Sequence, residues 1–377
     1  MCTRLFLTSS AKPALFYTSL LRYIMLINFD AGPAALPKEV LQQASEAILN
    51  YDNSGLSILE IAHRGKQFEA ILTEANALVK ELLELGDDYD VLWLQGGGRL
   101  QFCMLPMNFL SDNGTAGYIE SGHWAEEALK NARMYGHTHI LGSSKADQYT
   151  YIPDWGTVPE DLAYLHLTSN NTIYGTQFFS FPETKAPLVA DMSSELFSRK
   201  LDYTKFDLIY AVAQKNIGPA GVTLVVMRKS LSAQQKRELP EILSYRDVAA
   251  HNSVLNTPPV FAIYCSLLTL RWIKNMGMAA MEQRNREKAR LLYEAIDNSS
   301  LFYGVARKEH RSLMNACFRA RDEKHTQAFL DFARERNITG IKGHRSVGGF
   351  RASLYNAISV DDVQQLVAAM KAYEQSV

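Results

Sequence analysis

The sequence has few cysteines and no strong charge of either sign. Its four cysteines, Cys2, Cys103, Cys265 and Cys317, lie far apart and form no Cys-x-x-Cys pair. This spacing predicts neither a structural zinc site nor a disulfide framework, and it suits a reducing compartment such as the cytoplasm. The net charge of −1 gives no general attraction to nucleic acid. We therefore expect a cytoplasmic protein with no metal and no nucleic-acid partner.

The N-terminal segment lacks acidic residues and long apolar runs. No run there reaches the roughly 20 residues that span a bilayer, so we expect no membrane association. Residues 1–26 contain Arg4, Lys12 and Arg22 together with several Ser and Thr. This composition resembles a targeting segment. An upstream start codon, with Met25 as the natural first residue, is the alternative that we favour, and we treat residues 1–26 as an N-terminal extension outside the fold.

From residue 27 onward the chain has the pattern of a globular enzyme, and it is 47% hydrophobic and 21% charged over its whole length. Between residues 27 and 257, short apolar runs alternate with helical patterns. This predicts a large α/β domain with a mostly parallel sheet flanked by helices. Residues 258–377 begin with long helical patterns and continue with short strand-like pieces, which predict a linking helix and a smaller α+β C-terminal domain. The expected strands of the large domain are 90–95, 115–120, 162–168, 186–193, 207–214 and 221–227, and its expected helices include 38–49, 68–85 and 124–136.

The strongest local signal is a lysine that directly follows an apolar run. Lys215 lies in AVAQKNIGPAG, between the run at 207–214 and a glycine-rich turn. Lysine is rarely buried unless its charge is paired with another group or removed by loss of the proton. At the end of a buried strand its pKa can fall enough for it to attack an aldehyde. A solvated loop lysine is the other interpretation, and the pattern alone leaves both open.

Asp191 ends the preceding apolar run, about one crossover unit of a parallel sheet before Lys215. The ends of adjacent strands are where α/β enzymes place ligand-binding groups. A carboxylate at this position can pair with a pyridinium nitrogen and keep it protonated. Capping of the following segment is the alternative role.

A triple glycine in LQGGGRLQF connects an apolar run to a helical pattern and contains Gly98 and Arg99. Glycines let the backbone approach a phosphate, and a helix N-terminus offers free N–H groups. A purely structural turn is the alternative. The motif is neither GxGxxG nor a P-loop, which argues against a nicotinamide dehydrogenase. Trp124, at the start of the next helical pattern, is either a core residue or a flat face for an aromatic cofactor.

Three basic clusters carry the remaining signals: His63 with Arg64, His344 with Arg345, and Arg351 after Gly349 and Phe350. Arginine guanidinium groups hold carboxylates and phosphates with two parallel hydrogen bonds. Each cluster alone is typical of a surface charge. Together they suggest several groups that converge on one anionic substrate.

The segments NFDAGPAALP, HRGKQF, QGGGRLQF, AQKNIGPAGVTLV and KGHRSVGGFRASLYNA resemble the phosphoserine aminotransferase family, a class-V group of fold-type I pyridoxal-phosphate enzymes. The resemblance extends from Asn28 nearly to the C-terminus. It implies ping-pong transfer of an amino group from L-glutamate to 3-phosphohydroxypyruvate, which yields O-phospho-L-serine and 2-oxoglutarate in serine biosynthesis. Bacterial members also serve the 4-phosphohydroxy-L-threonine step of pyridoxal phosphate biosynthesis.

The resemblance also implies a role for each site residue and a homodimer with one pyridoxal 5'-phosphate per subunit. Lys215 would form the Schiff base. Arg351 would bind the α-carboxylate, and His344 and Arg345 the phosphate. The implied cofactor contacts are Gly98, Arg99, Trp124, Thr172, Asp191 and Gln214 of one subunit with Asn256 and Thr257 of its neighbour, which would also supply His63 and Arg64 to the substrate.

Two other hypotheses about function are compatible with the same fold. One is a different class-V enzyme, such as another aminotransferase, a lyase or a desulfurase. A desulfurase needs a mobile nucleophilic cysteine in a loop, whereas Cys317 lies in an apolar, strand-like run. The other is a non-catalytic relative, which predicts loss of the lysine or the aspartate, and both are present.

Overall fold

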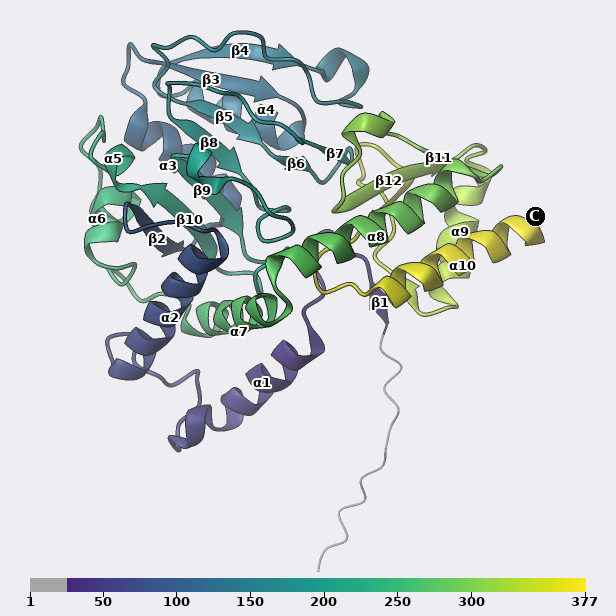
Figure 1. Ribbon diagram of the computed structural model, residues 1–377, viewed down its shortest axis with the longest axis horizontal. Coiled ribbons are helices and arrows are strands. Elements are labelled where there is room, and N and C mark those ends of the chain that lie inside the picture. The colour runs from purple at the N-terminus through teal and green to yellow at the C-terminus, as the bar shows by residue number, and fades with distance from the viewer. Residues whose placement is uncertain (1–25) are drawn as a thin grey trace, which may run out of the picture.

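The computed structural model describes residues 26–377, so residues 1–25 of the expected N-terminal extension lie outside the described part of the chain. Its centre is a seven-stranded sheet with the strand order β2-β10-β9-β8-β5-β3-β4 (Figure 1). The strands are β2 (Tyr89–Leu94), β3 (Thr115–Glu120), β4 (His137–Ser143), β5 (Leu165–Thr168), β8 (Leu188–Asp191), β9 (Leu208–Val212) and β10 (Thr223–Arg228).

The sheet is mostly parallel. The pairs β4 with β3, β3 with β5, β5 with β8, and β8 with β9 are all parallel. Only β10 runs the other way, antiparallel to both β9 and β2. Its direction follows from the glycine-rich turn after Lys215, which is too short for a crossover helix and sends the chain back along β9. The predicted α/β class is confirmed.

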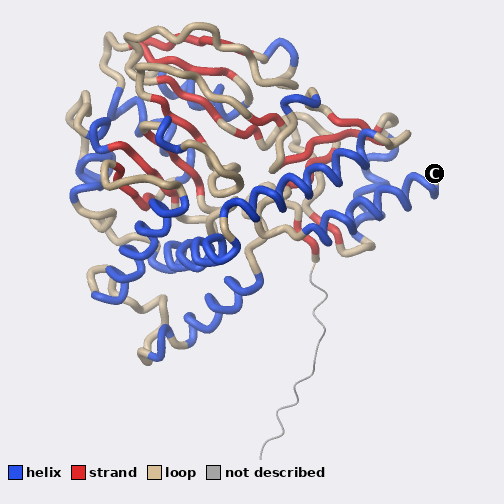
Figure 2. Tube along the Cα trace, viewed as in Figure 1, coloured by secondary structure: helices blue, strands red, loops and turns tan. Residues whose placement is uncertain are grey.

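Helices cover both faces of the sheet (Figures 1 and 2). The first face packs against α2 and α7, with α1 packed on the outside of α7, and the second face packs against α3, α4 and α6. The buried strands are apolar on both faces, as expected for a sheet between two helical layers. The bounds of these helices are α1 (Lys38–Leu49), α2 (Lys66–Leu82), α3 (Gly97–Phe109), α4 (His123–Ala132), α6 (Tyr245–Ala250) and α7 (Val260–Met276), with the short α5 (Lys229–Ser232) after β10.

A second core forms around the three-stranded antiparallel sheet β11-β12-β14. Residues far apart in sequence build it, because β1 at the start of the described chain pairs with β13. A capping box between Ser359 and Asp362 begins the last helix. The elements are β1 (Ile27–Asn28), α8 (Met278–Asp297), β11 (Phe302–Gly304), β12 (Asn315–Ala320), α9 (Lys324–Arg334), β13 (Ile338–Thr339), β14 (Phe350–Ser353) and α10 (Val360–Ser376), and the small hairpin β6 (Asn170–Asn171) with β7 (Thr176–Gln177) faces this region.

The linking region consists of two helices. Gly277, with φ of 79° and ψ of 142°, ends α7 and begins α8, because a residue with this non-helical backbone interrupts the helical hydrogen-bond ladder and glycine adopts a positive φ readily. Helix α7 packs in the core of the large sheet, while the C-terminal half of α8 packs in the second core. The division of the chain at residue 258 stays a prediction. Within residues 26–377, no helix is both long and apolar enough to cross a membrane.

Candidate active site

Lys215 and Asp191 lie where two neighbouring parallel strands end. Asp191 is the last residue of β8 and is buried, and Lys215 follows the end of β9 and is half-buried. Burial raises the pKa of Asp191, and the positive charge of Lys215 opposes this shift. Burial lowers the pKa of Lys215 to about 8, with Asp191 acting against the shift and Arg351 adding to it. The two groups are thus close enough to influence each other's charge.

The loop after β1 packs against the backbone around Lys215. The Ala34 N–H donates to the Gln214 carbonyl oxygen at 2.9 Å. At Gly32 the φ angle is 138°, and an added Cβ would lie 3.6 Å from Cγ of Lys215. A side chain there would therefore be strained as well as close to the lysine. The chain needs glycine at this position to bring the loop over Gln214 and Lys215.

The triple glycine forms the N-terminus of α3, as the sequence indicated. Gly96, with φ of 91°, precedes the helix, and no side chain caps its first amides. A Cβ added to Gly97 would meet nothing within 4 Å, so space is open beside these N–H groups. Gly98 and Arg99 lie in the first turn, and Arg99 Nη1 donates to Glu127 Oε2 at 2.9 Å. Free amides at a helix N-terminus next to open space suit an anion.

Trp124, Thr172 and Arg351 form one connected group. Trp124 Nε1 donates to Thr172 Oγ1 at 3.2 Å, and Arg351 Nη1 donates to the Thr172 carbonyl oxygen at 3.0 Å. Arg99 lies over the Trp124 ring, 5.7 Å from its centroid. Helix α4, the β6–β7 hairpin and β14 of the second core thereby meet, and Arg351 lies close enough to Lys215 to lower its pKa.

A buried polar network, which the sequence did not reveal, joins the two cores behind this group. Asn170 Nδ2 donates to Ser194 Oγ at 2.8 Å and to Asn315 Oδ1 at 2.7 Å. Asn315 Nδ2 in turn donates to Ser353 Oγ at 3.0 Å, next to Arg351 on β14. The sequence does show asparagines near the ends of its strands, but only the fold shows that Asn170 and Asn315 contact each other.

The loop 342–349 carries His344 and Arg345. Arg319 on β12 holds the loop, with Nη2 donating to the Val347 carbonyl oxygen at 2.7 Å. Burial and the nearby charges of Arg351, His123 and Arg345 lower the pKa of His344. Arg345 is exposed. The loop thus brings His344 into the field of Arg351 and leaves Arg345 extended into solvent.

Known proteins resemble this chain in both sequence and fold. The profile of the aminotransferase class-V family matches residues 26–366. The phosphoserine aminotransferase of Flavobacterium johnsoniae is 52% identical over 352 residues, which cover 93% of this chain and 99% of that protein. The chain belongs to the aminotransferase class-V family. The solved phosphoserine aminotransferase of Bacillus circulans subsp. alkalophilus has a TM-score of 0.91 at 44% identity, with 93% of this chain and 99% of that one covered.

Membership of the class-V aminotransferases confirms the predicted enzyme class and its cofactor, pyridoxal phosphate. A pyridoxal-phosphate-bound phosphoserine aminotransferase from Trichomonas vaginalis has a TM-score of 0.88 at 36% identity, and 92% of this chain and 99% of that one are covered. The residues present fit such a cofactor. At the carboxyl ends of the strands lie a buried carboxylate, a lysine of lowered pKa and an uncapped helix N-terminus.

Four of the predicted site residues of this aminotransferase lie apart from that group. His63 is half-buried and Arg64 is exposed, and neither makes a hydrogen bond or ion pair within residues 26–377. Asn256 Nδ2 donates to Gln95 Oε1 at 3.5 Å, and Gln95 Nε2 donates to the Thr257 carbonyl oxygen at 3.2 Å. Asn256 and Thr257 thus contact the segment that leads into the triple glycine.

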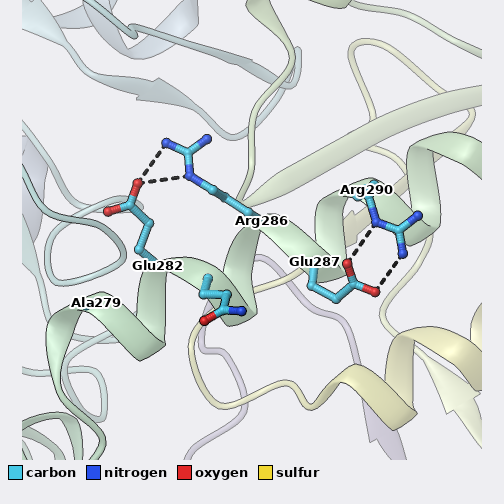
Figure 3. Close-up of a pocket in the computed structure, with 6 residues that line it drawn as sticks. Ala279, Glu282, Arg286, Glu287 and Arg290 are labelled. Atoms are coloured by element: carbon cyan, nitrogen blue, oxygen red, sulfur yellow. Dashed lines mark hydrogen bonds and ion pairs between the residues drawn. The ribbon is translucent and has the colours of Figure 1, made fainter.

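Two features elsewhere in the aminotransferase offer no competing site. A surface depression along α8 has guanidinium groups that are already paired, Arg286 with Glu282 and Arg290 with Glu287, each at 2.7 Å (Figure 3). Cys317 is buried in β12, and burial raises the pKa of its thiol to about 12, which is unsuited to a nucleophile. In the described part of the chain, no group of three or more His, Cys, Asp or Glu side chains is placed to hold a metal ion.

Proposed function

We propose that this aminotransferase converts 3-phosphohydroxypyruvate and L-glutamate into O-phospho-L-serine and 2-oxoglutarate. It would serve serine biosynthesis in the cytoplasm, and the same site would also form 4-phosphohydroxy-L-threonine from the corresponding phosphorylated keto acid in pyridoxal phosphate biosynthesis. The observation that best supports this proposal is that Lys215 lies close enough to both Asp191 and Arg351, and His344 close enough to Arg351, for their charges to shift the pKa values of Lys215 and His344. Relatives at 52% and 50% identity that carry the name phosphoserine aminotransferase support the proposal.

Two sets of residues would hold the cofactor at its opposite ends. The amides of Gly98 and Arg99 at the start of α3, with Gln214, would bind its phosphate. Asp191 would pair with the ring nitrogen, Trp124 would cover the ring and Thr172 would contact its hydroxyl side. Bound pyridoxal phosphate supplies the electron sink that makes the substrate's Cα proton acidic.

Lys215 would act twice in this mechanism. Its amine is the point of covalent attachment for the cofactor, and a pKa of about 8 leaves a usable fraction of neutral amine near neutral pH. With substrate bound, the free Nζ of Lys215 would accept the substrate's Cα proton and deliver it again. A group whose pKa lies near the working pH is suited to both directions of proton transfer.

The cationic groups would orient the substrate at its two ends. Arg351 uses Nη1 for the Thr172 carbonyl oxygen, and its buried Nε has no partner among residues 26–377, so donors remain for an α-carboxylate. His344 and Arg345 would bind the far end. Because glutamate brings a carboxylate there and the keto acid a phosphate, a loop suits this task better than a rigid strand.

A comparison of two keto acids tests the proposal. With glutamate as donor, we expect kcat/KM for 3-phosphohydroxypyruvate to exceed that for unphosphorylated hydroxypyruvate by roughly 100-fold, because the phosphate would make charge-assisted hydrogen bonds that the analogue lacks. A coupled assay of 2-oxoglutarate release measures both. Equal use of the two keto acids would reject the assignment of the phosphate site.

We also propose a homodimer whose subunits share active sites. Leu49 on α1 is 82% exposed and Leu59 is 63% exposed, and Leu41 and Leu56 in the same stretch of chain are exposed as well. An exposed apolar patch of this kind is typical of a protein interface. His63 and Arg64 directly follow it, so a partner that covers the patch would receive both side chains near its surface.

Mixing two inactive variants tests the shared site. If Arg64 acts in the partner's site, a hybrid of Arg64→Ala and Lys215→Ala subunits contains one intact site, so activity should return on mixing. Random exchange at equal amounts would give about one quarter of wild-type activity, since half of the dimers are hybrids with one working site. No recovery in a mixture shown to exchange subunits would contradict the proposal.

A further inference from the structure

Thr168, the last residue of β5, carries a buried hydroxyl that the proposed mechanism does not use. The side chain is 2% exposed, and its Oγ1 has no hydrogen-bond partner within the described residues. A buried hydroxyl without a partner costs free energy, so such a group calls for an explanation. The residues around Thr168 suggest an explanation for this hydroxyl.

Thr168 and Asp191 are direct neighbours across the β5–β8 pair. Leu167 and Ala190, one position earlier on each strand, pack into the core on the α2 and α7 side of the sheet. Side chains alternate between the two faces of a strand. Thr168 and Asp191 therefore project side by side from the opposite face, where neighbouring strands lie about 4.8 Å apart.

The Asp191 carboxylate has room for another donor. The Ser193 N–H donates to Oδ1 at 2.9 Å, and the Ser193 hydroxyl, which accepts from the Val212 N–H at 3.2 Å, keeps its own proton for the carboxylate. Both the N–H and the hydroxyl of Ser193 lower the pKa of Asp191. An ionised carboxylate offers about four acceptor sites, so the two donors of Ser193 leave room for a further one.

Two groups that flank Asp191 from the other strand and from the loop are already engaged or charged. Tyr210 on β9 flanks Asp191 on its other side, and its hydroxyl pairs with Nε2 of the buried His166 at 2.9 Å. Lys215 acts on Asp191 through its charge. Thr168 therefore carries the uncommitted hydroxyl on the strand beside the carboxylate.

We propose that Thr168 is a positioning residue: its hydroxyl, which has no partner in this structure, turns to donate to Asp191 when the cofactor is bound and holds that carboxylate ionised and oriented toward the cofactor's ring nitrogen. The inference rests on the proposed role of Asp191. Burial works against the charged form of this carboxylate, and a hydrogen bond to the charged form works in its favour. Thr168 acts only through Asp191 and is not itself a catalytic residue.

Three substitutions separate the hydroxyl from the shape of the side chain. Thr168→Val keeps the volume and removes the hydroxyl, Thr168→Ala removes it with a smaller side chain, and Thr168→Ser retains it. Thr223→Val is the matched control, because Thr223 is also a buried strand threonine with an unpartnered hydroxyl, but its strand neighbours are Val212 and Leu94.

The direct measurement is the Asp191 pKa in cofactor-loaded protein with ¹³C-labelled aspartate, followed by NMR. We expect Thr168→Val and Thr168→Ala to raise this pKa by about one unit, since a hydrogen bond to a charged group has that order of effect. Thr168→Ser and Thr223→Val should leave it near the wild-type value. The dissociation constant for pyridoxal phosphate should rise about tenfold in the first two variants only.

An Asp191 pKa that stays unchanged in a folded Thr168→Val or Thr168→Ala protein overturns the inference, as does a Thr168→Ser protein that shifts equally. Either result would leave the proposed reaction standing, because wild-type turnover of the phosphorylated keto acid is measured separately. Failure of the wild-type protein to bind pyridoxal phosphate would instead remove the proposed function.

Discussion

The two ends of the candidate site are built in opposite ways. Asp191 and Lys215 stand at the ends of β8 and β9, two strands that are buried along their whole length. His344 and Arg345 lie on the loop 342–349, and Arg345 is exposed. The first end is fixed by the sheet, and the second depends on a few contacts such as that of Arg319 with the loop.

This difference matches what each end is proposed to do. Proton transfer requires shifted pKa values, and burial is the first cause of the shifts at Asp191 and Lys215. Anion binding at the far end requires adaptation, because a carboxylate and a phosphate would take turns there. We therefore expect substitutions at the buried end to abolish chemistry, and those at the loop to weaken substrate binding by smaller factors.

The largest effect is expected for Lys215→Ala. Without the amine, kcat should fall by roughly 10⁴-fold, since both the covalent attachment and the proton carrier are lost. The coupled assay with glutamate and 3-phosphohydroxypyruvate measures it. Lys200→Ala is the control, because Lys200 is an exposed lysine paired with Glu84 at 3.1 Å. Equal rates in wild type and Lys215→Ala would show that the buried end of the site does not perform the chemistry.

Arg351→Gln should have the next largest effect. This residue belongs structurally to the buried end, through its bond to the Thr172 carbonyl oxygen, but is proposed to bind substrate. We expect kcat/KM to fall roughly 100-fold through the loss of a charge-assisted contact. The affinity for pyridoxal phosphate should hardly change, and fluorescence titration of the cofactor-free protein checks that. A variant that loses cofactor affinity instead would place Arg351 in the cofactor site.

The sequence was most informative where burial leaves a local pattern. The expected strand at residues 115–120 has the bounds found for β3, and the apolar runs that end near Asp191 and Lys215 became neighbouring strands. What it could not provide were non-local pairings, such as that of Ile27 with Ile338. The edge strand β4 was missed because its residues are mostly exposed and carry no apolar run.

The same limit applies within the candidate site. Lys215 was recognisable from its own neighbours, whereas Thr168 gained meaning only from its register with Asp191 on another strand. Arg99 was expected at a phosphate, and the structure pairs it with Glu127. Such pairings depend on which helices and strands become neighbours in space, and a single segment does not encode this.

The pH dependence of cofactor capture examines the buried end directly. Only the neutral amine attacks an aldehyde, and burial lowers the Lys215 pKa to about 8. The rate of covalent capture by cofactor-free protein should therefore rise about 30-fold between pH 6.5 and 9 and level off above that. Stopped-flow absorbance follows the reaction. A rate that still climbs toward pH 10.5 would show that Lys215 has the pKa of a solvated lysine.

The smallest effect is expected at the loop. Arg319→Gln removes the donor to the Val347 carbonyl oxygen and should raise KM for 3-phosphohydroxypyruvate about tenfold while kcat stays within about twofold. Arg321→Gln is the matched control, since this nearby exposed arginine lies over the Tyr303 ring and makes no side-chain hydrogen bond to the described chain. A fall in kcat without a change in KM would mean that the loop belongs to the rigid end.

Chemical trapping at Lys215 tests the central claim most directly. Borohydride reduction of the cofactor-loaded protein, followed by digestion and mass spectrometry, shows which amine holds pyridoxal phosphate. We expect a reduced phosphopyridoxyl group on the peptide that contains Lys215, and none after Lys215→Ala. Attachment to a different lysine, or no stable label on a protein that binds the cofactor, would contradict it.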